Sequence, residues 1–261
     1  MPLDDTILVG RDGAIATVVL NRPEKLNALT RPMWKRLGEV FGELSADDTV
    51  RCVVIRGAGT KAFAPGNDIS EFATERSNVE QARAYGEDMR RTIEAISSCR
   101  HPVIAQIHGI CVGGGLEIAA LCDVRICGEG SRFGAPIKNL GLVMAYAEMA
   151  PLVRLVGTDV ALEILLEGRI FDAVEAKEKR LVTRVVPDAD VGTEALATAR
   201  RIADGAPRVA RWHKKFARRL ADARPITAAE YDECFDCFDT EDFRVGYAAF
   251  LAKRKPEFVG R

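Results

Sequence analysis

The chain has 261 residues, of which 48% are hydrophobic, and its 37 basic residues nearly balance 38 acidic ones. This balance gives no overall attraction to nucleic acid or to a membrane surface, so we expect neither as a partner. No stretch approaches the roughly 20 apolar residues that a membrane-spanning helix needs. A chain of this length can bury a large core.

The acidic start over residues 1–5 lacks the basic and apolar segments of a secretory signal, and we expect a cytoplasmic protein. Seven cysteines are scattered mostly through apolar segments, which is typical of reduced core residues. Cys234 and Cys237 form a single C-x-x-C pair, and the three histidines are dispersed. The sequence therefore predicts no metal site.

In the first half of the chain, the sequence predicts strands that alternate with helices. A turn at Asp12-Gly13 predicts a hairpin, and Thr30 ahead of Pro32 predicts the start of a helix with one apolar face. The predicted strands cover residues 6–10, 14–20, 50–56, 103–108 and 123–127, and a further helix covers residues 78–98.

A glycine-containing turn follows the third of these strands and leads into residues 62–69. Asp68 is placed to cap a short helix that comes next. Pro65 has no N–H group, whereas Asn67 has one that could point at a ligand. This turn is the first of two that can present backbone donors.

Three consecutive glycines, residues 113–115, form the second turn. We expect a buried strand before them and a helix from Leu116 onward. Free N–H groups at a helix start can hold a developing negative charge. Glu117 lies about one turn past Gly114, among apolar neighbours that would raise its pKa and suit it to proton transfer. Taken alone, this segment could also be a purely structural glycine turn followed by a glutamate that points into solvent.

From about Asp190 the predicted strands stop. The helices expected there cover residues 191–203, 207–221, 227–238 and 239–253. Too many of their positions are apolar for them to stand free in water, which indicates packing against another surface.

Motifs along nearly the whole chain resemble those of the enoyl-CoA hydratase/isomerase family, the crotonase superfamily. They are the segments 20–29, 63–69, 108–109, 112–117, 133–136 and 250–258. The resemblance implies an α/β fold with a crotonase-like ββα spiral core over residues 1–190. It also implies a C-terminal helical oligomerisation region over residues 191–261, which builds a homotrimer or a hexamer.

The resemblance also assigns a site for an acyl-CoA thioester. The N–H groups of Asn67 and Gly114 would bind the thioester oxygen, with Glu117 as the catalytic carboxyl group. Coenzyme A would enter as part of the substrate, so no separate cofactor is implied. The positions implied to contact the substrate are Lys25, Asn27, Ala28, Asn67, Asp68, Ile69, Ser70, Gly113, Gly114, Phe250 and Lys253, the last two often from a neighbouring subunit.

One departure from the family pattern concerns the second carboxylate. Family members that hydrate enoyl-CoAs carry a second glutamate where this chain has Ile137, and others carry an aspartate where this chain has Ala145. Glu148 could substitute, but most helix glutamates are solvated or ion-paired. Tyr146 is a further candidate, although an aromatic residue in such a segment usually packs.

Hydration of a 2-enoyl-CoA is the favoured function, because Glu117 stands where a proton shuttle is expected. Double-bond isomerisation, or decarboxylation of a malonyl-type acyl-CoA, uses the same enolate and remains open. An alternative of another class is a non-catalytic member that only binds CoA. The sequence contains neither the glycine motif that binds dinucleotides nor the loop that binds nucleoside triphosphates. It therefore does not favour a dinucleotide-dependent oxidoreductase.

Overall fold

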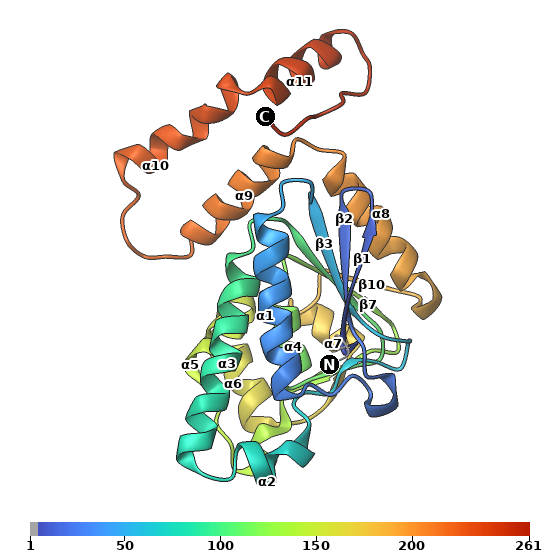
Figure 1. Ribbon diagram of the computed structural model, residues 1–261, viewed down its shortest axis with the longest axis vertical. Helices are drawn as coiled ribbons and strands as arrows, with labels where there is room; N and C mark the ends of the chain where they lie inside the picture. The colour runs from blue at the N-terminus through green and yellow to red at the C-terminus, as the bar shows by residue number, and fades with distance from the viewer. Residues whose placement is uncertain (1–4) are drawn as a thin grey trace.

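Two sheets of unequal size carry the fold of residues 5–261, which this computed structural model describes (Figure 1). Residues 1–4, part of the acidic start, lie outside the described residues. The larger sheet has six strands. In spatial order these are β1 (Ile7–Asp12), β2 (Ile15–Leu20), β3 (Cys52–Gly57), β5 (Val103–Ile107), β7 (Val124–Gly128) and β10 (Arg184–Val186). Only the predicted hairpin, β1 with β2, is antiparallel, and this prediction is confirmed.

The smaller sheet has four short strands. They are β4 (Ala62–Ala64), β6 (Ile110–Val112), β8 (Arg132–Gly134) and β9 (Phe171–Asp172), and the first three run parallel. We did not predict these strands, because two or three residues are too few to show an alternating pattern. One consequence is a correction: β6, and not β5, leads into the three glycines.

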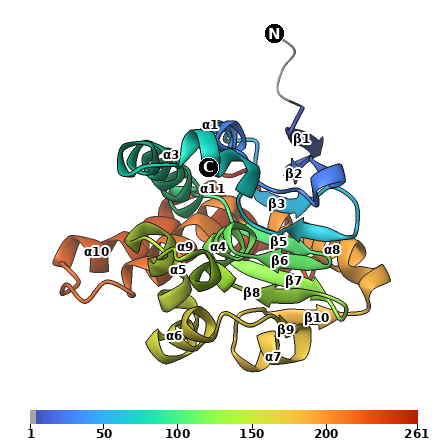
Figure 2. The same cartoon turned by 90° about the horizontal axis from the view of Figure 1, so that it is seen from below.

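The strands follow one another through the molecule largely in chain order (Figure 2). Figure 2 shows α1 and α3 at one end of this succession and α6 and α7 at the other. Each turn of the chain adds a strand to a sheet and returns through a loop or a helix. This arrangement is the ββα spiral that the resemblance implies.

Helix α1 (Arg31–Ala46) begins after the predicted cap Thr30, helix α3 (Val79–Ser98) fills nearly all of the helix predicted over residues 78–98, and the two pack against each other. The hydroxyl of Thr30 accepts a hydrogen bond from the Met33 N–H, and the Asn78 side chain accepts one from the Gln81 N–H. The apolar face of α1 is fully buried, including Trp34. These two helices cover one side of the core.

Helix α8 (Val191–Ala203) covers the other face of the six-stranded sheet. Its Ala195 and Ala199 pack against strand residues that include Ile15 and Ile104. The boundary predicted after Asp190 therefore coincides with the start of a helix that still belongs to the core. The next helix, α9 (Pro207–Arg219), lies at the end of the core from which the last helices extend (Figure 1).

The remaining helices connect these layers or extend beyond them. They are α2 (Phe72–Glu75), α4 (Gly114–Leu121), α5 (Tyr146–Val156), α6 (Thr158–Glu167), α7 (Ala173–Glu178), α10 (Ala228–Asp232) and α11 (Glu241–Leu251). The helix predicted over residues 227–238 changes after α10 into a tighter 3₁₀ segment, Glu233–Asp239. Among the described residues, no helix is both long and apolar enough to cross a membrane.

Candidate active site

A cavity of about 470 Å³ lies at the carboxyl ends of β4, β6 and β8. The segments that follow these three parallel strands form most of its wall, because parallel strands deliver their loops to one edge of a sheet. The lining residues are Ala28, Pro65, Gly66, Asn67, Asp68, Ile69, Phe72, Arg76, Val112, Gly113, Gly114, Glu117, Pro136, Ile137, Asn139, Leu140, Leu142, Val143 and Glu148. The small sheet thus brings both predicted turns into one site.

The two turns touch at Gly66 and Gly114. A Cβ atom added to Gly66 would lie 3.2 Å from the Gly114 nitrogen, so neither turn has room for a side chain there. Among the described residues, no group accepts a hydrogen bond from the backbone N–H of Asn67 or of Gly114. Both donors border the cavity and remain free to bind an oxygen atom there.

Helix α4 begins at Gly114, two residues before the predicted start at Leu116. Gly113 has a φ of +52°, a conformation that residues with a side chain rarely adopt. Gly115 faces β4 so closely that an added Cβ would lie 2.2 Å from the Ala64 carbonyl oxygen. The glycine run is therefore required by the backbone path and by the contact between α4 and the small sheet.

The side chain of Asn67 is held by the core and not by the cavity. The Trp34 indole N–H donates to the Asn67 Oδ1 across 2.7 Å, and the Asn67 Nδ2 lies 3.8 Å from the Met89 Sδ. These two contacts hold the turn that follows β4 against the core. What Asn67 offers to the cavity without competition is its backbone N–H group.

Glu117 is buried, with 6% of its surface exposed. Its Oε2 atom has no hydrogen-bond partner among the described residues. The pKa of Glu117 is raised to about 8, mainly by burial and also by the nearby Glu148 carboxylate, while the Arg76 guanidinium partly offsets both effects. Glu117 therefore holds a proton at neutral pH, as a general acid would.

Ile137 lines the cavity with an aliphatic side chain that also packs against the core. A second carboxyl group is nevertheless present, because Glu148 lines the same cavity from α5. Glu148 is partly exposed and forms no ion pair among the described residues, so it is not the ion-paired helix residue that was one of two expectations, and burial raises its pKa. Tyr146 does not line this cavity and is 94% exposed, so it does not pack in the core either.

Arg76 is a lining residue that sequence reasoning missed. It follows α2, and its guanidinium lies over the rings of Phe72 and Tyr85, at 4.8 and 4.9 Å from their centroids. No ion pair is formed by Arg76 within the part of the chain that the structure describes. A lone arginine in a polar segment carries no sequence signal, because its position depends on how α2 packs.

The predicted CoA positions fall into distinct groups. Ala28, Asp68 and Ile69 line the cavity, whereas Lys25 is exposed beside it and Ser70 bonds to Asp68. Asp68 also forms an ion pair with Arg22 at 3.0 Å.

Asn27 and the two C-terminal positions do not line the cavity. The buried Asn27 side chain donates to the carbonyl oxygens of Ala58 and Ala62, which supports the turn that follows β3. Phe250 and Lys253 lie on and just after α11, at the opposite end of the molecule from α2 (Figure 1). Contact between these two and the site of this chain would need a neighbouring subunit.

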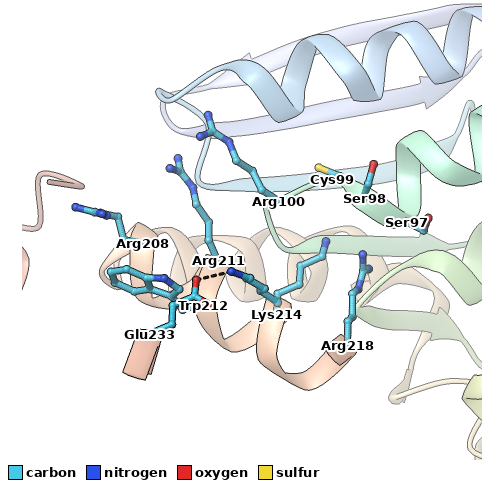
Figure 3. A pocket seen from close by; sticks show the side chains of 11 residues that line it. Ser97, Ser98, Cys99, Arg100, Arg208, Arg211, Trp212, Lys214, Arg218 and Glu233 are labelled. Atoms are coloured by element: carbon cyan, nitrogen blue, oxygen red, sulfur yellow. Dashed lines mark hydrogen bonds and ion pairs between the residues drawn. The ribbon is translucent and has the colours of Figure 1, made fainter. Parts of the chain in front are cut away.

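A second cavity, of about 490 Å³, lies between α9 and the end of α3 (Figure 3). Its cations are largely paired: Lys214 and Arg218 bind Asp123 at 2.7 and 3.0 Å, and Arg100 and Arg211 share Asp48. The Lys214 side chain is only 7% exposed. These ion pairs fasten α9 to the core, so Lys214, Arg218 and Arg211 are not part of a solvated helix face.

No group of three or more potential metal ligands comes together among the described residues. Five of the seven cysteines are buried and none forms a disulfide within those residues. The charged groups that line the cavity are the carboxyl groups of Asp68, Glu117 and Glu148 and the guanidinium of Arg76.

Known proteins share both this fold and nearly the full length of the chain. Residues 10–261 match the family model described as enoyl-CoA hydratase/isomerase. A probable enoyl-CoA hydratase of Mycobacterium bovis is 36% identical, over 98% of this chain and 99% of its own. The short-chain-enoyl-CoA hydratase of Clostridium acetobutylicum is 34% identical over 97% of both chains. A solved enoyl-CoA hydratase/carnithine racemase from Magnetospirillum magneticum has a TM-score of 0.97 and 54% identity, over 98% of this chain and 96% of that one.

The fold and the cavity together define an α/β enzyme of the crotonase class, and Asn67, Gly114 and the buried Glu117 all line that cavity. The protein belongs to the enoyl-CoA hydratase/isomerase family.

Proposed function

We propose that this protein is an enoyl-CoA hydratase, which adds water across the double bond of a 2-enoyl-CoA. The observation that carries the proposal is the meeting of the Asn67 and Gly114 N–H groups beside the buried carboxyl group of Glu117. Relatives named enoyl-CoA hydratase support it. The thioester oxygen would accept hydrogen bonds from both N–H groups, which stabilises the enolate formed when water attacks the β-carbon.

Glu117 would then protonate the α-carbon. This carbon is bonded directly to the thioester carbon, so it lies near the two N–H groups when the oxygen is bound. Glu117 is about one helical turn from Gly114 and is protonated at neutral pH. Its burial keeps water from competing for the enolate.

The adenine and phosphate end of the CoA would leave the cavity past Ala28, Asp68 and Ile69. We place Phe250 and Lys253 of a neighbouring subunit at the outer part of the CoA. Exposed aromatic side chains on the C-terminal helices support a homotrimer or hexamer, since Phe235 and Tyr247 are 62% and 59% exposed. A cytoplasmic location is part of the same proposal, and cell fractionation tests it.

The test is incubation of the purified protein with crotonyl-CoA, a 3-enoyl-CoA and methylmalonyl-CoA, followed by mass measurement of the products. A gain of one water by crotonyl-CoA supports the hydratase. Conversion of the 3-enoyl-CoA alone would assign an isomerase, and loss of carbon dioxide from methylmalonyl-CoA would assign a decarboxylase. Tight binding of CoA esters without any turnover would assign a binding protein. The control is Glu117→Gln, which should abolish the conversion and leave CoA binding intact.

A further inference from the structure

Hydration requires two proton transfers, and the family position for the second carboxylate holds Ile137. We propose that Glu148, on α5, is the second catalytic carboxylate of this site and activates the attacking water. The inference rests on the proposed hydratase function and names the group that completes it.

The placement of Glu148 carries the first part of the argument. It is the third residue of α5, a helix that packs directly against α4, which carries Glu117. The Ala145 N–H donates to the Glu148 Oε2 across 3.1 Å and draws the side chain back over the start of its own helix. Both carboxyl groups thus reach one cavity from neighbouring helices.

The electrostatic surroundings carry the second part. Four charged residues line the cavity, namely Asp68, Arg76, Glu117 and Glu148. Asp68 is neutralised by Arg22. Glu148 also borders a hollow beside α3 that contains Arg83 and Arg90, and Arg90 is paired with Glu87 and Glu94. Arg76 is therefore the cation that faces both carboxyl groups within the cavity.

One positive charge facing two carboxyl groups favours a state in which one of them is ionised and the other holds a proton. Glu117 is the more deeply buried and keeps the proton. Glu148 receives a backbone hydrogen bond, which favours its charged form. Glu117 can then act as the general acid and Glu148 as the general base, and addition of water needs one of each.

The proton transfers balance with these two groups alone. The Glu148 carboxylate takes a proton from water as the oxygen bonds to the β-carbon. The electron pair of the double bond moves toward the α-carbon and the thioester oxygen, and the α-carbon then takes the proton of Glu117. Exchange of one proton between the two carboxyl groups, or with solvent, restores the starting state.

The order of the two carboxyl groups along the substrate agrees with this assignment. Glu117 shares helix α4 with the Gly114 N–H, so it lies on the side of the thioester and the α-carbon. Glu148 comes from the next helix, which follows Leu142 and Val143 in the chain, and these two apolar residues line the same cavity and could contact the acyl chain. The β-carbon is one bond farther along the chain than the α-carbon.

The experiment separates the two carboxyl groups by two reactions of the full-length protein. Hydration of crotonyl-CoA needs both groups. Exchange of the α-protons of butyryl-CoA for deuterium, measured by mass at pH 8, needs the two N–H groups and Glu117 but no attacking water. The variants are Glu148→Gln and Glu117→Gln, and the matched control is Glu80→Gln, an exposed glutamate at the start of α3.

We expect Glu148→Gln to lower kcat for hydration by roughly 10²–10⁴-fold while deuterium exchange stays within about threefold of the wild type. Glu117→Gln should lose both reactions, and Glu80→Gln neither. Hydration by Glu148→Gln at the wild-type rate would overturn the proposal. Equal loss of hydration and exchange would overturn it as well, because it would assign Glu148 a supporting role. A wild-type protein that exchanges α-protons but hydrates no enoyl-CoA would refute the hydratase assignment itself.

Discussion

The Trp34 indole N–H donates a hydrogen bond to the Asn67 side-chain oxygen across 2.7 Å. This bond joins the buried face of α1 to the turn that follows β4, where Asn67 lines the cavity and its backbone N–H has no acceptor among the described residues. A core residue thereby orients a donor of the candidate active site. The side chain and the backbone of Asn67 have separate roles, which substitutions can distinguish.

Asn67→Pro removes the backbone N–H, and Asn67→Ala keeps it while deleting the side chain. We expect the proline variant to lower kcat/KM for crotonyl-CoA by about 10²–10³-fold, because one of two donors to the oxyanion is lost. The alanine variant should lose mainly stability, by about 1 kcal/mol. Steady-state kinetics and thermal unfolding of both proteins provide the check. Equal activity of the two variants would contradict the role of the N–H group.

Glu117→Gln should stabilise the protein in a manner that depends on pH. The pKa of folded Glu117, about 8, lies above its ordinary value of 4.5, so the folded state binds more protons between these pH values. The stability of the wild type therefore falls as pH rises through this interval. We expect the variant to gain ~4 kcal/mol over the wild type at pH 8 and nothing below pH 4.5. Urea unfolding at pH 4.5 and pH 8 measures this, and a gain that is the same at both would contradict the burial argument.

Arg76→Gln removes the cation that faces both carboxyl groups. Because the guanidinium lowers the pKa of Glu117 and of Glu148, its loss should raise both. Glu148 must be ionised to accept a proton, so we expect the acidic limb of the hydration pH profile to move to higher pH. Arg83→Gln, a neighbouring arginine outside this cavity, is the control. Identical pH profiles for Arg76→Gln and the wild type would rule out this influence.

A glutamate at position 137 should partly replace Glu148. Ile137 lines the same cavity, and its side chain is only partly buried against the core. We expect Ile137→Glu to raise the hydration rate of the Glu148→Gln variant about tenfold or more, since general base catalysis is worth roughly 10²–10⁴-fold. Circular dichroism confirms that the double variant is folded. If the double variant is folded but hydrates no faster than Glu148→Gln, a carboxylate at position 137 does not reach the attacking water.

The exposed aromatic residues of the C-terminal helices provide a test of assembly. Phe235 and Tyr247 are mostly exposed in the single chain, and charges there would be buried if the helices pack against other subunits. We expect Phe235→Glu with Tyr247→Glu to reduce the mass measured by light scattering from that of a trimer or hexamer. Leu166→Glu, at an equally exposed site on α6, should leave the mass unchanged. A wild-type protein with the mass of one chain would refute the oligomer.

Local patterns predicted a large part of this fold, and the reason is that caps, turns and apolar periodicity act over a few residues. The Thr30 cap, the buried face of α1 and the hairpin at Gly13 all lie where the sequence indicates them. The strands of the small sheet escaped prediction, because they are short and stabilised by neighbours distant in the chain.

The same division holds for the candidate site. The sequence by itself determined the two glycine-containing turns, Glu117 between apolar residues, and the aliphatic side chain at position 137, since each of these is a property of a short segment. Only the tertiary structure decided that Glu148 and Arg76 face the cavity, because helix and loop packing places them there. It also showed that α8 belongs to the core, since its apolar face meets several strands, of which β2 and β3 lie more than a hundred residues earlier. Burial of a carboxyl group depends on all the elements around it, and so does its pKa.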